Sequence, residues 1–239
     1  MKNLESSNEN SSFLNQLTKE DQHILLLHGT KITVREGSIL FFEGEEAKYI
    51  YLLRQGQVRL SKMTIENKKF YLHLKQKDDI VGEFSLFNEM SLSMTAEVIT
   101  EATLIRFDRK NLEALFTQNG DIAVAFIKLF AKNTQSTQAK FSDLLLYGKT
   151  GAYYSMLIRF ANSYGTPHPK GVRISIKLTN QDLAYFIGTS RETINRMFND
   201  LKKENIVEID KGNIVIKNIE YLRKHLQCGK CPLQICTIS

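Results

Sequence analysis

The sequence predicts an α+β protein in which an antiparallel β-roll is followed by a long helix and a C-terminal winged helix-turn-helix. Three observations lead to this fold class. Short β-branched and aromatic runs alternate with turn signals over residues 31–107. A helical pattern that contains no Pro, and no Gly after Gly120, occupies residues 119–147. A capped helix, a glycine turn, a polar helix and a tight hairpin then follow one another within residues 178–217.

Length and composition are those of a globular protein with two domains. The chain has 239 residues, of which 42% are hydrophobic and 24% charged, so each domain can bury its own core. No stretch reaches the roughly eighteen unbroken apolar residues of a membrane helix. The start, MKNLESSNENSSF, lacks the apolar core of a secretion signal. We therefore expect a cytoplasmic protein that does not bind membranes. The net charge of +6 and the pI near 9.1 suit a polyanionic partner, although many basic proteins never touch nucleic acid.

Six short strands are predicted in the roll. Turn signals such as Gln55-Gly56 and Glu66-Asn67 separate them. Strands this short and this regularly punctuated are typical of an all-β sandwich or a barrel-like roll. We expect them at Ile39–Phe42, Tyr49–Leu53, Gln57–Ser61, Phe70–Leu74, Ala96–Ile99 and Thr103–Phe107.

The long helix carries a narrow apolar stripe. Its members are Ile122, Ala125, Phe126, Leu129, Phe141, Leu144 and Leu145. A stripe with no local sheet to cover is often a dimer seam, and packing of the helix on its own β domain is the alternative. Gly148 marks the end of this helix, Tyr153–Tyr164 continues as another apolar helix, and Pro167 and Pro169 mark a loop.

The helix-turn-helix is defined by its caps. Thr179 is a favourable N-cap with Asp182 three residues later, and Gly188 is a left-handed residue that closes the first helix. Thr189 is expected to cap the second helix, with Glu192 at the capping-box position.

The second helix has an apolar and a polar face. Its inward residues are Ile194, Met197, Phe198 and Leu201, and its outward residues are Ser190, Arg191, Thr193, Asn195 and Arg196. Polar groups placed in this way meet base edges and phosphates when a recognition helix enters the major groove. A hairpin at residues 210–212 joins strands at 206–209 and 213–217 and completes a winged helix. A purely structural helical hairpin is the alternative.

The segment TNQDLAYFIGTSRETINRMF resembles the helix-turn-helix of the CRP/FNR family of bacterial regulators, whose order of elements matches residues 14–226. The resemblance implies that Arg191, Glu192 and Arg196 read bases, and that Thr179, Gln181, Ser190 and Thr193 contact phosphates. It also implies a homodimer that reads a palindrome in double-stranded DNA, with half-sites like TGTGA, and that works with RNA polymerase. From the residues alone, Arg196 suits the two acceptors of guanine, whereas Glu192 is equally a capping partner.

The expected domains follow these changes of pattern. In chain order they are a disordered arm at 1–12, a β-roll sensor domain at 13–118, a dimerisation helix at 119–147, a winged helix-turn-helix domain at 148–226 and a cysteine tail at 227–239.

Cyclic nucleotides are not the expected signal. In cyclic-nucleotide-binding relatives of the family, a Gly-Glu pair binds the ribose and an Arg-Ser/Thr-Ala triplet binds the phosphate. Gly82-Glu83 preserves the first part, but Met94-Thr95-Ala96 has methionine at the arginine position. Because a thioether cannot pair with a buried phosphate, we expect Glu83 to be a structural remnant and no cyclic nucleotide to bind.

All three cysteines, Cys228, Cys231 and Cys236, lie in the last twelve residues. An odd number in a reducing compartment argues against a disulfide framework. Three soft thiolates within nine residues suit iron–sulfur ligation or zinc equally, and a thiol redox switch is a third interpretation. Three cysteines are one ligand short of a cysteine-only site. His225, one helical turn before Cys228, either completes a zinc site or is a solvated helix-end residue.

The tail CGKCPLQIC, with FSDLLLYGKTGAYYSMLIR upstream, resembles the FNR branch of this family in Bacillus-type Gram-positive bacteria. The resemblance implies a four-iron four-sulfur cluster held by Cys228, Cys231, Cys236 and Asp143, and regulation of anaerobic genes in response to oxygen. The residues alone would not select Asp143, which precedes an apolar run and has a second interpretation as a surface carboxylate.

Two other functions fit the same residues. One is a regulator with a structural zinc tail that senses another signal through the roll. The other is a thiol oxidoreductase that uses Cys228 and Cys231, but the thioredoxin-like strand-turn-helix context is missing around them. Beyond the tail there is no nucleophile–base pair and no phosphate-cradling loop, so we expect no enzyme.

Overall fold

The computed structural model describes residues 13–86, 91–228 and 232–238, so the arm expected at 1–12 lies outside the described residues. The predicted α+β class is confirmed. The chain divides into two compact units, and the division falls within the long helix α4 (Gly120–Tyr164), after Asn133. In the described ranges, no helix combines the length and the apolar character that crossing a membrane requires.

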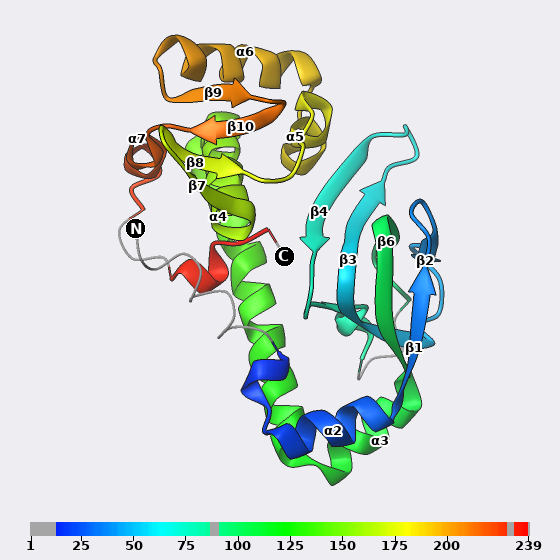
Figure 1. Cartoon of the computed structure of the whole chain (residues 1–239). Coiled ribbons are helices and arrows are strands. Elements are labelled where there is room, and N and C mark those ends of the chain that lie inside the picture. The colour runs from blue at the N-terminus through cyan, green and yellow to red at the C-terminus, as the bar shows by residue number, and fades with distance from the viewer. Residues whose placement is uncertain (1–12, 87–90, 229–231, 239) are drawn as a thin grey trace. The chain divides into compact units, whose positions relative to one another are not determined.

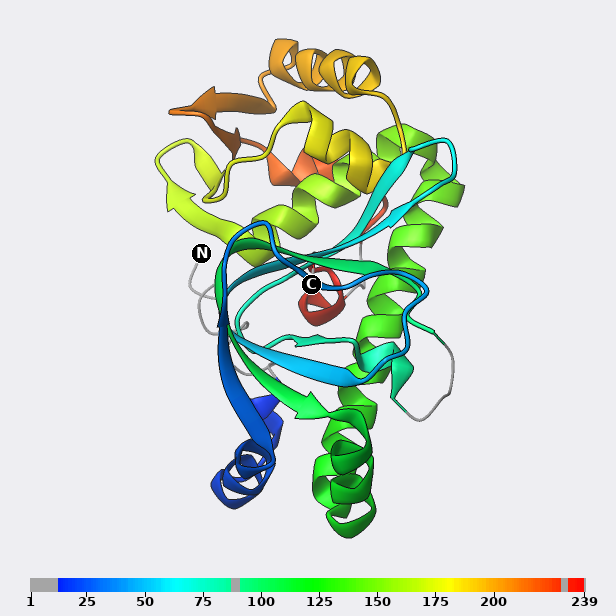
Figure 2. The same ribbon diagram turned by 90° about the vertical axis from the view of Figure 1, so that its right-hand side faces the viewer.

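The N-terminal unit is an antiparallel roll (Figure 1). Its strands are β1 (Gly29–Val34), β2 (Ile39–Phe41), β3 (Tyr49–Met63), β4 (Lys69–Lys75), β5 (Ile80–Val81) and β6 (Thr95–Asp108). They pair in the order β1-β6-β3-β4, with β2 on β6 and β5 on β3. Figure 2 shows the strands curving around one interior, which is filled by apolar side chains such as Tyr51, Val58 and Leu104.

β3 and β6 are longer than predicted, since each joins two of the predicted short strands. The turn signal at Gly56 is instead a bulge inside β3, with φ +90° and register shifts around it. A Cβ at Gly56 would lie 2.5 Å from the Glu101 carbonyl oxygen, so the close approach of the two strands requires glycine. β1 and the two-residue β5 were not predicted.

The helices of this unit share a second core. They are η1 (Leu14–Gln16), α2 (Lys19–Leu27), α3 (Arg109–Gln118) and the beginning of α4, while the short η2 (Glu83–Ser85) is followed by Leu86 of the same core. In this core the Phe126 ring lies 6.1 Å from that of Phe13 and 5.1 Å from that of Phe116. The first four residues of the predicted stripe, Ile122, Ala125, Phe126 and Leu129, are all buried here. Their assignment to a dimer seam is therefore wrong, because they cover their own domain.

Other apolar side chains of α4 are exposed, and two of them, Phe141 and Leu145, belong to the predicted stripe, so for these two the dimer seam stays a prediction. The exposed set contains Val124, Ile127, Phe141, Leu145 and Leu146, while Leu144 is half-buried. Positions 124, 127, 141 and 145 keep the alternating three- and four-residue spacing of a coiled-coil seam. These exposed residues, rather than the buried ones, form the candidate dimer face of α4.

The C-terminal unit begins on α4 and contains the winged helix. α4 is broken at Gly148, with φ 62° and ψ −162°, so the predicted end of the first helix at this glycine is confirmed. A four-stranded antiparallel sheet has the order β7-β8-β10-β9. The elements are β7 (Gly165–His168), β8 (Gly171–Ile174), α5 (Asn180–Ile187), α6 (Arg191–Lys203), β9 (Val207–Asp210), β10 (Asn213–Ile216), α7 (Ile219–His225) and η3 (Leu233–Ile235).

The segment expected to be a loop around Pro167 and Pro169 is a hairpin of β7 and β8. Pro167 pairs with Val172, and β7 is an edge strand of the sheet. An edge strand tolerates proline because one of its sides needs no backbone N–H donor.

Candidate DNA-binding surface and candidate metal centre

The first helix of the helix-turn-helix begins and ends as predicted. The Thr179 hydroxyl accepts a hydrogen bond from the Asp182 backbone N–H at 3.0 Å, and the Asp182 carboxylate accepts one from the Thr179 backbone N–H at 3.0 Å. This capping box fixes the start of α5. Gly188, with φ 71° and ψ 43°, ends the helix in a left-handed conformation.

The second helix begins one residue later than predicted. Its N-cap is Ser190, whose hydroxyl accepts a hydrogen bond from the Thr193 backbone N–H at 3.3 Å. Thr189 instead donates its backbone N–H to the Ala184 carbonyl oxygen at 3.0 Å. The predicted capping box of Thr189 with Glu192 is therefore wrong, because Thr189 belongs to the turn that closes α5.

α6 has the two predicted faces. Ile194, Met197, Phe198 and Leu201 are buried, as expected. Of the candidate DNA contacts, Arg191, Glu192, Arg196, Thr179 and Ser190 are exposed, and Gln181 and Thr193 are half-buried. Asn195 does not belong to the outward face, because its side-chain oxygen accepts a hydrogen bond from Asn180 of α5. The wing is also present, with Lys211 and Gly212 in left-handed conformations at its tip.

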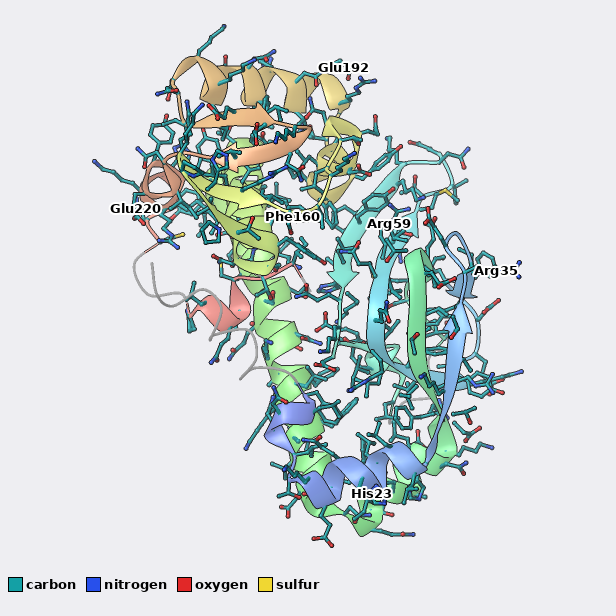
Figure 3. The ribbon with its side chains drawn as sticks, viewed as in Figure 1. His23, Arg35, Arg59, Phe160, Glu192 and Glu220 are labelled. Atoms are coloured by element: carbon teal, nitrogen blue, oxygen red, sulfur yellow. The ribbon has the colours of Figure 1, made fainter. Side chains whose placement is uncertain are left out.

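Glu192 lies at the N-terminal end of α6, on the outside of the unit (Figure 3). Hydrogen bonds from its own backbone N–H and from the Ser190 hydroxyl lower the pKa of Glu192. The carboxylate is therefore charged, and the helix dipole favours a negative charge at this end. A carboxylate can accept a hydrogen bond from cytosine, and the guanidinium groups of Arg191 and Arg196 suit guanine or phosphate. The exposed start of α6 thus carries the donors and acceptors that reading a base sequence requires.

A second candidate site lies in the same unit, where the tail packs against α4. A pocket of about 210 Å³ is lined by Asp143, Cys228 and Cys236, together with Ser155 and Arg159. Cys228 is exposed and Cys236 is half-buried. Cys231, the third expected ligand, lies outside the described residues. The fold thus brings the predicted aspartate to one pocket with two of the predicted cysteines.

The end of the tail is held by side chains of α4, and Figure 1 shows it in red beside that helix. The Asn162 amide donates to the Cys236 carbonyl oxygen at 2.8 Å, and the Lys140 ammonium group lies 3.4 Å from the Ile238 carbonyl oxygen. The Ile238 backbone N–H donates to the Ser163 hydroxyl at 3.1 Å, and the Ile238 side chain is completely buried. The Asn162 contact fixes the backbone of Cys236, from which its thiol reaches the pocket, while the other contacts hold Ile238 two residues later.

The donors at the pocket fit an iron–sulfur cluster. Two thiols and a carboxylate line it, and the third cysteine of the sequence lies between the two in the tail. Sulfur donors are the usual ligands of such clusters. Within the described ranges, from which Cys231 is missing, no three His, Cys, Asp or Glu residues gather closely enough to hold a single ion. His225 is not among the pocket-lining residues, and its ring packs on that of Tyr154 at 4.9 Å.

Ser155 and Arg159 line the same pocket but were not among the predicted site residues. A signal was available in the sequence. The two residues lie four apart in the otherwise apolar run Tyr153–Ala161, so they share one face of a helix whose neighbours are buried.

The roll holds a buried charged cluster at the Gly-Glu pair. The Glu83 carboxylate accepts hydrogen bonds from Lys75 at 3.0 Å and from Asn133 of α4 at 2.9 Å, both at Oε1. Burial alone would lower the pKa of Lys75, but the negative charges of Glu83 and Asp79 outweigh it and raise that pKa. Burial raises the pKa of Asp79. Glu83 is therefore already paired with a cation of its own domain, and Met94 is half-buried against the core of the roll.

These features define a class of protein: a winged-helix transcription regulator with a β-roll domain before it. Comparisons with known proteins agree. Residues 31–119 match the cyclic nucleotide-binding domain, and residues 154–225 match the Crp-like helix-turn-helix domain. The chain is 41% identical over 212 residues to the "Anaerobic regulatory protein" of Bacillus subtilis (strain 168), covering 88% of this chain and 89% of that protein. It is 24% identical over 188 residues to the "CRP-like cAMP-activated global transcriptional regulator" of Mycobacterium tuberculosis, covering 79% and 84%.

Solved structures share the fold. The c-di-GMP responsive global regulator CLP of Xanthomonas campestris superposes with a TM-score of 0.75 at 20% identity, covering 84% of this chain and all of that one. A CooA mutant from Carboxydothermus hydrogenoformans gives 0.71 at 18% identity, covering 84% and 89%. The chain belongs to the CRP/FNR family. It is a DNA-binding transcription regulator and not an enzyme, and regulators of the CRP family are dimers.

Proposed function

We propose that the protein regulates anaerobic genes in response to oxygen, through a four-iron four-sulfur cluster held by Cys228, Cys231, Cys236 and Asp143. The observation that carries the proposal is the pocket that Asp143 of α4 shares with Cys228 and Cys236 of the tail. The name of the relative at 41% identity, an anaerobic regulatory protein, supports the same function. When bound, the cluster supplies iron that oxygen can oxidise.

The protein residues connect the pocket to DNA binding. Asp143 lies on α4 before the break at Gly148, and the cysteines follow the winged helix in the chain. Ligands on both segments tie the tail to the helix that leads into the DNA-binding domain. Holding or releasing this tie changes how the two α6 helices of a dimer are presented to DNA.

The DNA target follows from the family and from α6. We propose that a cytoplasmic homodimer, formed through the exposed apolar face of α4, reads a palindrome with half-sites like TGTGA. The half-sites would lie roughly 34 Å apart, one turn of DNA. Arg191, Glu192 and Arg196 would read bases, Thr179, Gln181, Ser190 and Thr193 would contact phosphates, and bound DNA would be presented to RNA polymerase.

The visible spectrum and the iron, sulfide and zinc content of anaerobically purified protein test this proposal. We expect a brown protein that contains iron and sulfide, that loses its colour in air and that loses affinity for the palindrome at the same time. His225→Ala is the matched control, and it should leave the spectrum unchanged because His225 packs on Tyr154. A colourless protein that contains zinc would contradict the proposal and favour a structural zinc tail.

A further inference from the structure

Arg159 is among the largest fully buried side chains of the described structure, with only 1% of its surface exposed. It lies on α4 after the break, between the buried residues Ile158 and Phe160. A guanidinium group in such surroundings is costly unless several acceptors compensate for the lost water. The hydrogen-bond acceptors that surround Arg159 therefore indicate the role of its buried guanidinium group.

Two of these acceptors belong to the tail. Nη1 of Arg159 donates to the Ile235 carbonyl oxygen at 2.8 Å and lies 3.2 Å from that of Thr237. These residues flank Cys236, whose own carbonyl oxygen accepts a hydrogen bond from Asn162. Three consecutive carbonyl groups are thus held by side chains of α4, and the backbone that carries the Cys236 thiol is fixed on both sides.

The remaining acceptors lead to Asp143. Nε of Arg159 donates to the Ser155 hydroxyl at 3.1 Å, and that hydroxyl donates to Asp143 Oδ2 at 2.5 Å. Nη2 of Arg159 lies 3.6 Å from the same oxygen, and Nη1 lies 3.3 Å from the Ser136 hydroxyl. In the described part of the chain both polar contacts of Asp143 are made by Oδ2. Oδ1 therefore keeps its lone pairs for another partner.

We propose that Arg159 is the positioning residue of the iron–sulfur site, an inference that rests on the proposed function. The N–H donors of its planar guanidinium group, its fork, hold two expected cluster ligands in place. They hold Asp143 through Ser155, and they hold Cys236 through the carbonyl groups beside it. Its permanent positive charge also offsets the negative charge that thiolates and a carboxylate bring to a partly buried site. A lysine supplies the charge but not the planar set of donors that spans both segments.

Three variants separate these roles. Arg159→Gln removes both the charge and the planar set of donors, and Arg159→Lys removes the planar set alone. Ser155→Ala breaks the hydrogen-bonded link to Asp143 and leaves the direct ion pair of 3.6 Å and the tail contacts in place. Lys140→Ala is the matched control. Lys140 is another cation of α4 near a tail carbonyl group, that of Ile238, but it does not line the pocket.

Hydrogen exchange of the cluster-free full-length protein measures how firmly the tail is held against α4 when no metal is bound. In Arg159→Lys and Arg159→Gln, we expect backbone amides of residues 233–238 to exchange about tenfold faster, as the loss of hydrogen bonds to a charged group implies. Ser155→Ala should keep the wild-type rate there, because it leaves both tail carbonyl contacts intact. Lys140→Ala should keep it at residues 235–237.

Anaerobic reconstitution then measures the effect on the cluster. Arg159→Gln should shift the reduction potential to a more negative value, because a lost neighbouring cation makes an added electron less favourable. Arg159→Lys should keep the potential near that of the wild type. Arg159→Lys and Ser155→Ala should both lose visible absorbance in air several-fold faster than the wild type and Lys140→Ala. A purely structural role would leave the potential unchanged.

The outcomes distinguish this inference from the function on which it rests. Suppose that the wild type takes up a cluster, that the tail amides of Arg159→Lys exchange at the wild-type rate, and that the cluster of Ser155→Ala decays at the wild-type rate. The positioning role of Arg159 is then refuted, and the proposed function stands. If the wild type takes up no cluster, the proposed function fails and the positioning role fails with it. Should Arg159→Gln not fold, the two milder variants decide by the same criteria.

Discussion

The ammonium group of Lys75 and the carboxylate of Glu83 form an ion pair of 3.0 Å in which each side chain is 1% exposed. Glu83 belongs to the segment that binds a ribose in cyclic-nucleotide-binding relatives. Here the same carboxylate connects β4, through Lys75, to Asn133 of α4. The other oxygen, Oε2, is buried without a hydrogen bond among the described residues. Because Oε2 of Glu83 has no such partner, the buried negative charge of Glu83 depends strongly on Lys75 for compensation.

Lys75→Met should therefore destabilise the protein by about 3–5 kcal/mol, because it leaves Glu83 as an uncompensated buried charge. Urea unfolding followed by far-UV circular dichroism measures this, since the chain has no tryptophan to report on it. The double variant Lys75→Met with Glu83→Gln is the control and should recover part of the loss. A single variant that costs less than about 1 kcal/mol would show that the ion pair does not stabilise the roll.

Cyclic AMP at millimolar concentration should produce no saturable heat in calorimetry and no change in DNA affinity. Glu83 is occupied by Lys75, and Met94 offers no positive charge to the phosphate. A relative named as cAMP-activated is the positive control. Clear saturable binding would mean that another cation of the roll has taken the role of the missing arginine.

Arg196→Ala should cost about 1–3 kcal/mol in binding to the cognate palindrome and should relax the preference for guanine at one position of each half-site. Arg196 is exposed on α6 next to the buried Met197, so the fold should tolerate the change. Lys203→Ala, at the other end of α6, is the matched control. Fluorescence anisotropy with cognate and scrambled DNA measures both. Equal weakening on the two sequences would make Arg196 a phosphate contact.

Gly148→Ala should cost about 1–3 kcal/mol, because φ 62° with ψ −162° lies in a region that is nearly restricted to glycine. For a chain of this size, each kcal/mol lowers the unfolding midpoint by about 2–4 °C. Gly120→Ala is the control, since a Cβ there meets no atom within 4 Å. A midpoint equal to that of the wild type would mean that α4 can pass through this position without its break.

The helix-turn-helix could be predicted from the sequence because local rules decide it. The cap at Thr179, the left-handed Gly188 and the buried face from Ile194 to Leu201 each depend on residues a few positions away. The cap of α6 was misplaced by one residue because Thr189 and Ser190 both offer a hydroxyl. Only the backbone bond from Thr189 to Ala184 decides between them.

Local rules of this kind do not predict contacts between residues that are distant in sequence. The apolar spacing of Ile122 and Phe126 identified a buried face but not the surface that covers it, which is supplied in part by Phe13. The sequence analysis did not single out Lys75 or Arg159, both of which are buried in the structure. Lys75 pairs with Glu83, and Arg159 donates to carbonyl groups of the tail. No local pattern specifies either partner.

The proposed fourth ligand is tested most directly by changing its donor atom. A carboxylate oxygen is a harder donor than a thiolate, so iron at Asp143 should be the most weakly held corner of the cluster. Asp143→Ala should keep the fold and the thiolates but weaken the coupling between cluster state and DNA binding. Cys228→Ser, Cys231→Ser or Cys236→Ser should each abolish assembly, because two thiolates are too few.

Asp143→Cys gives the opposite expectation and is therefore the most informative variant. A fourth soft donor at the same position of α4 should make the cluster decay more slowly in air and keep operator binding for longer after exposure. Decay of the visible absorbance, measured together with operator binding on the same samples, compares all variants with the wild type. Glu113→Ala is the control, a carboxylate paired with Arg109 in the N-terminal unit. If Asp143→Ala and Asp143→Cys both decayed and bound DNA like the wild type, Asp143 would be an ordinary partner of Ser155 and Arg159, and the fourth ligand would have to be sought elsewhere.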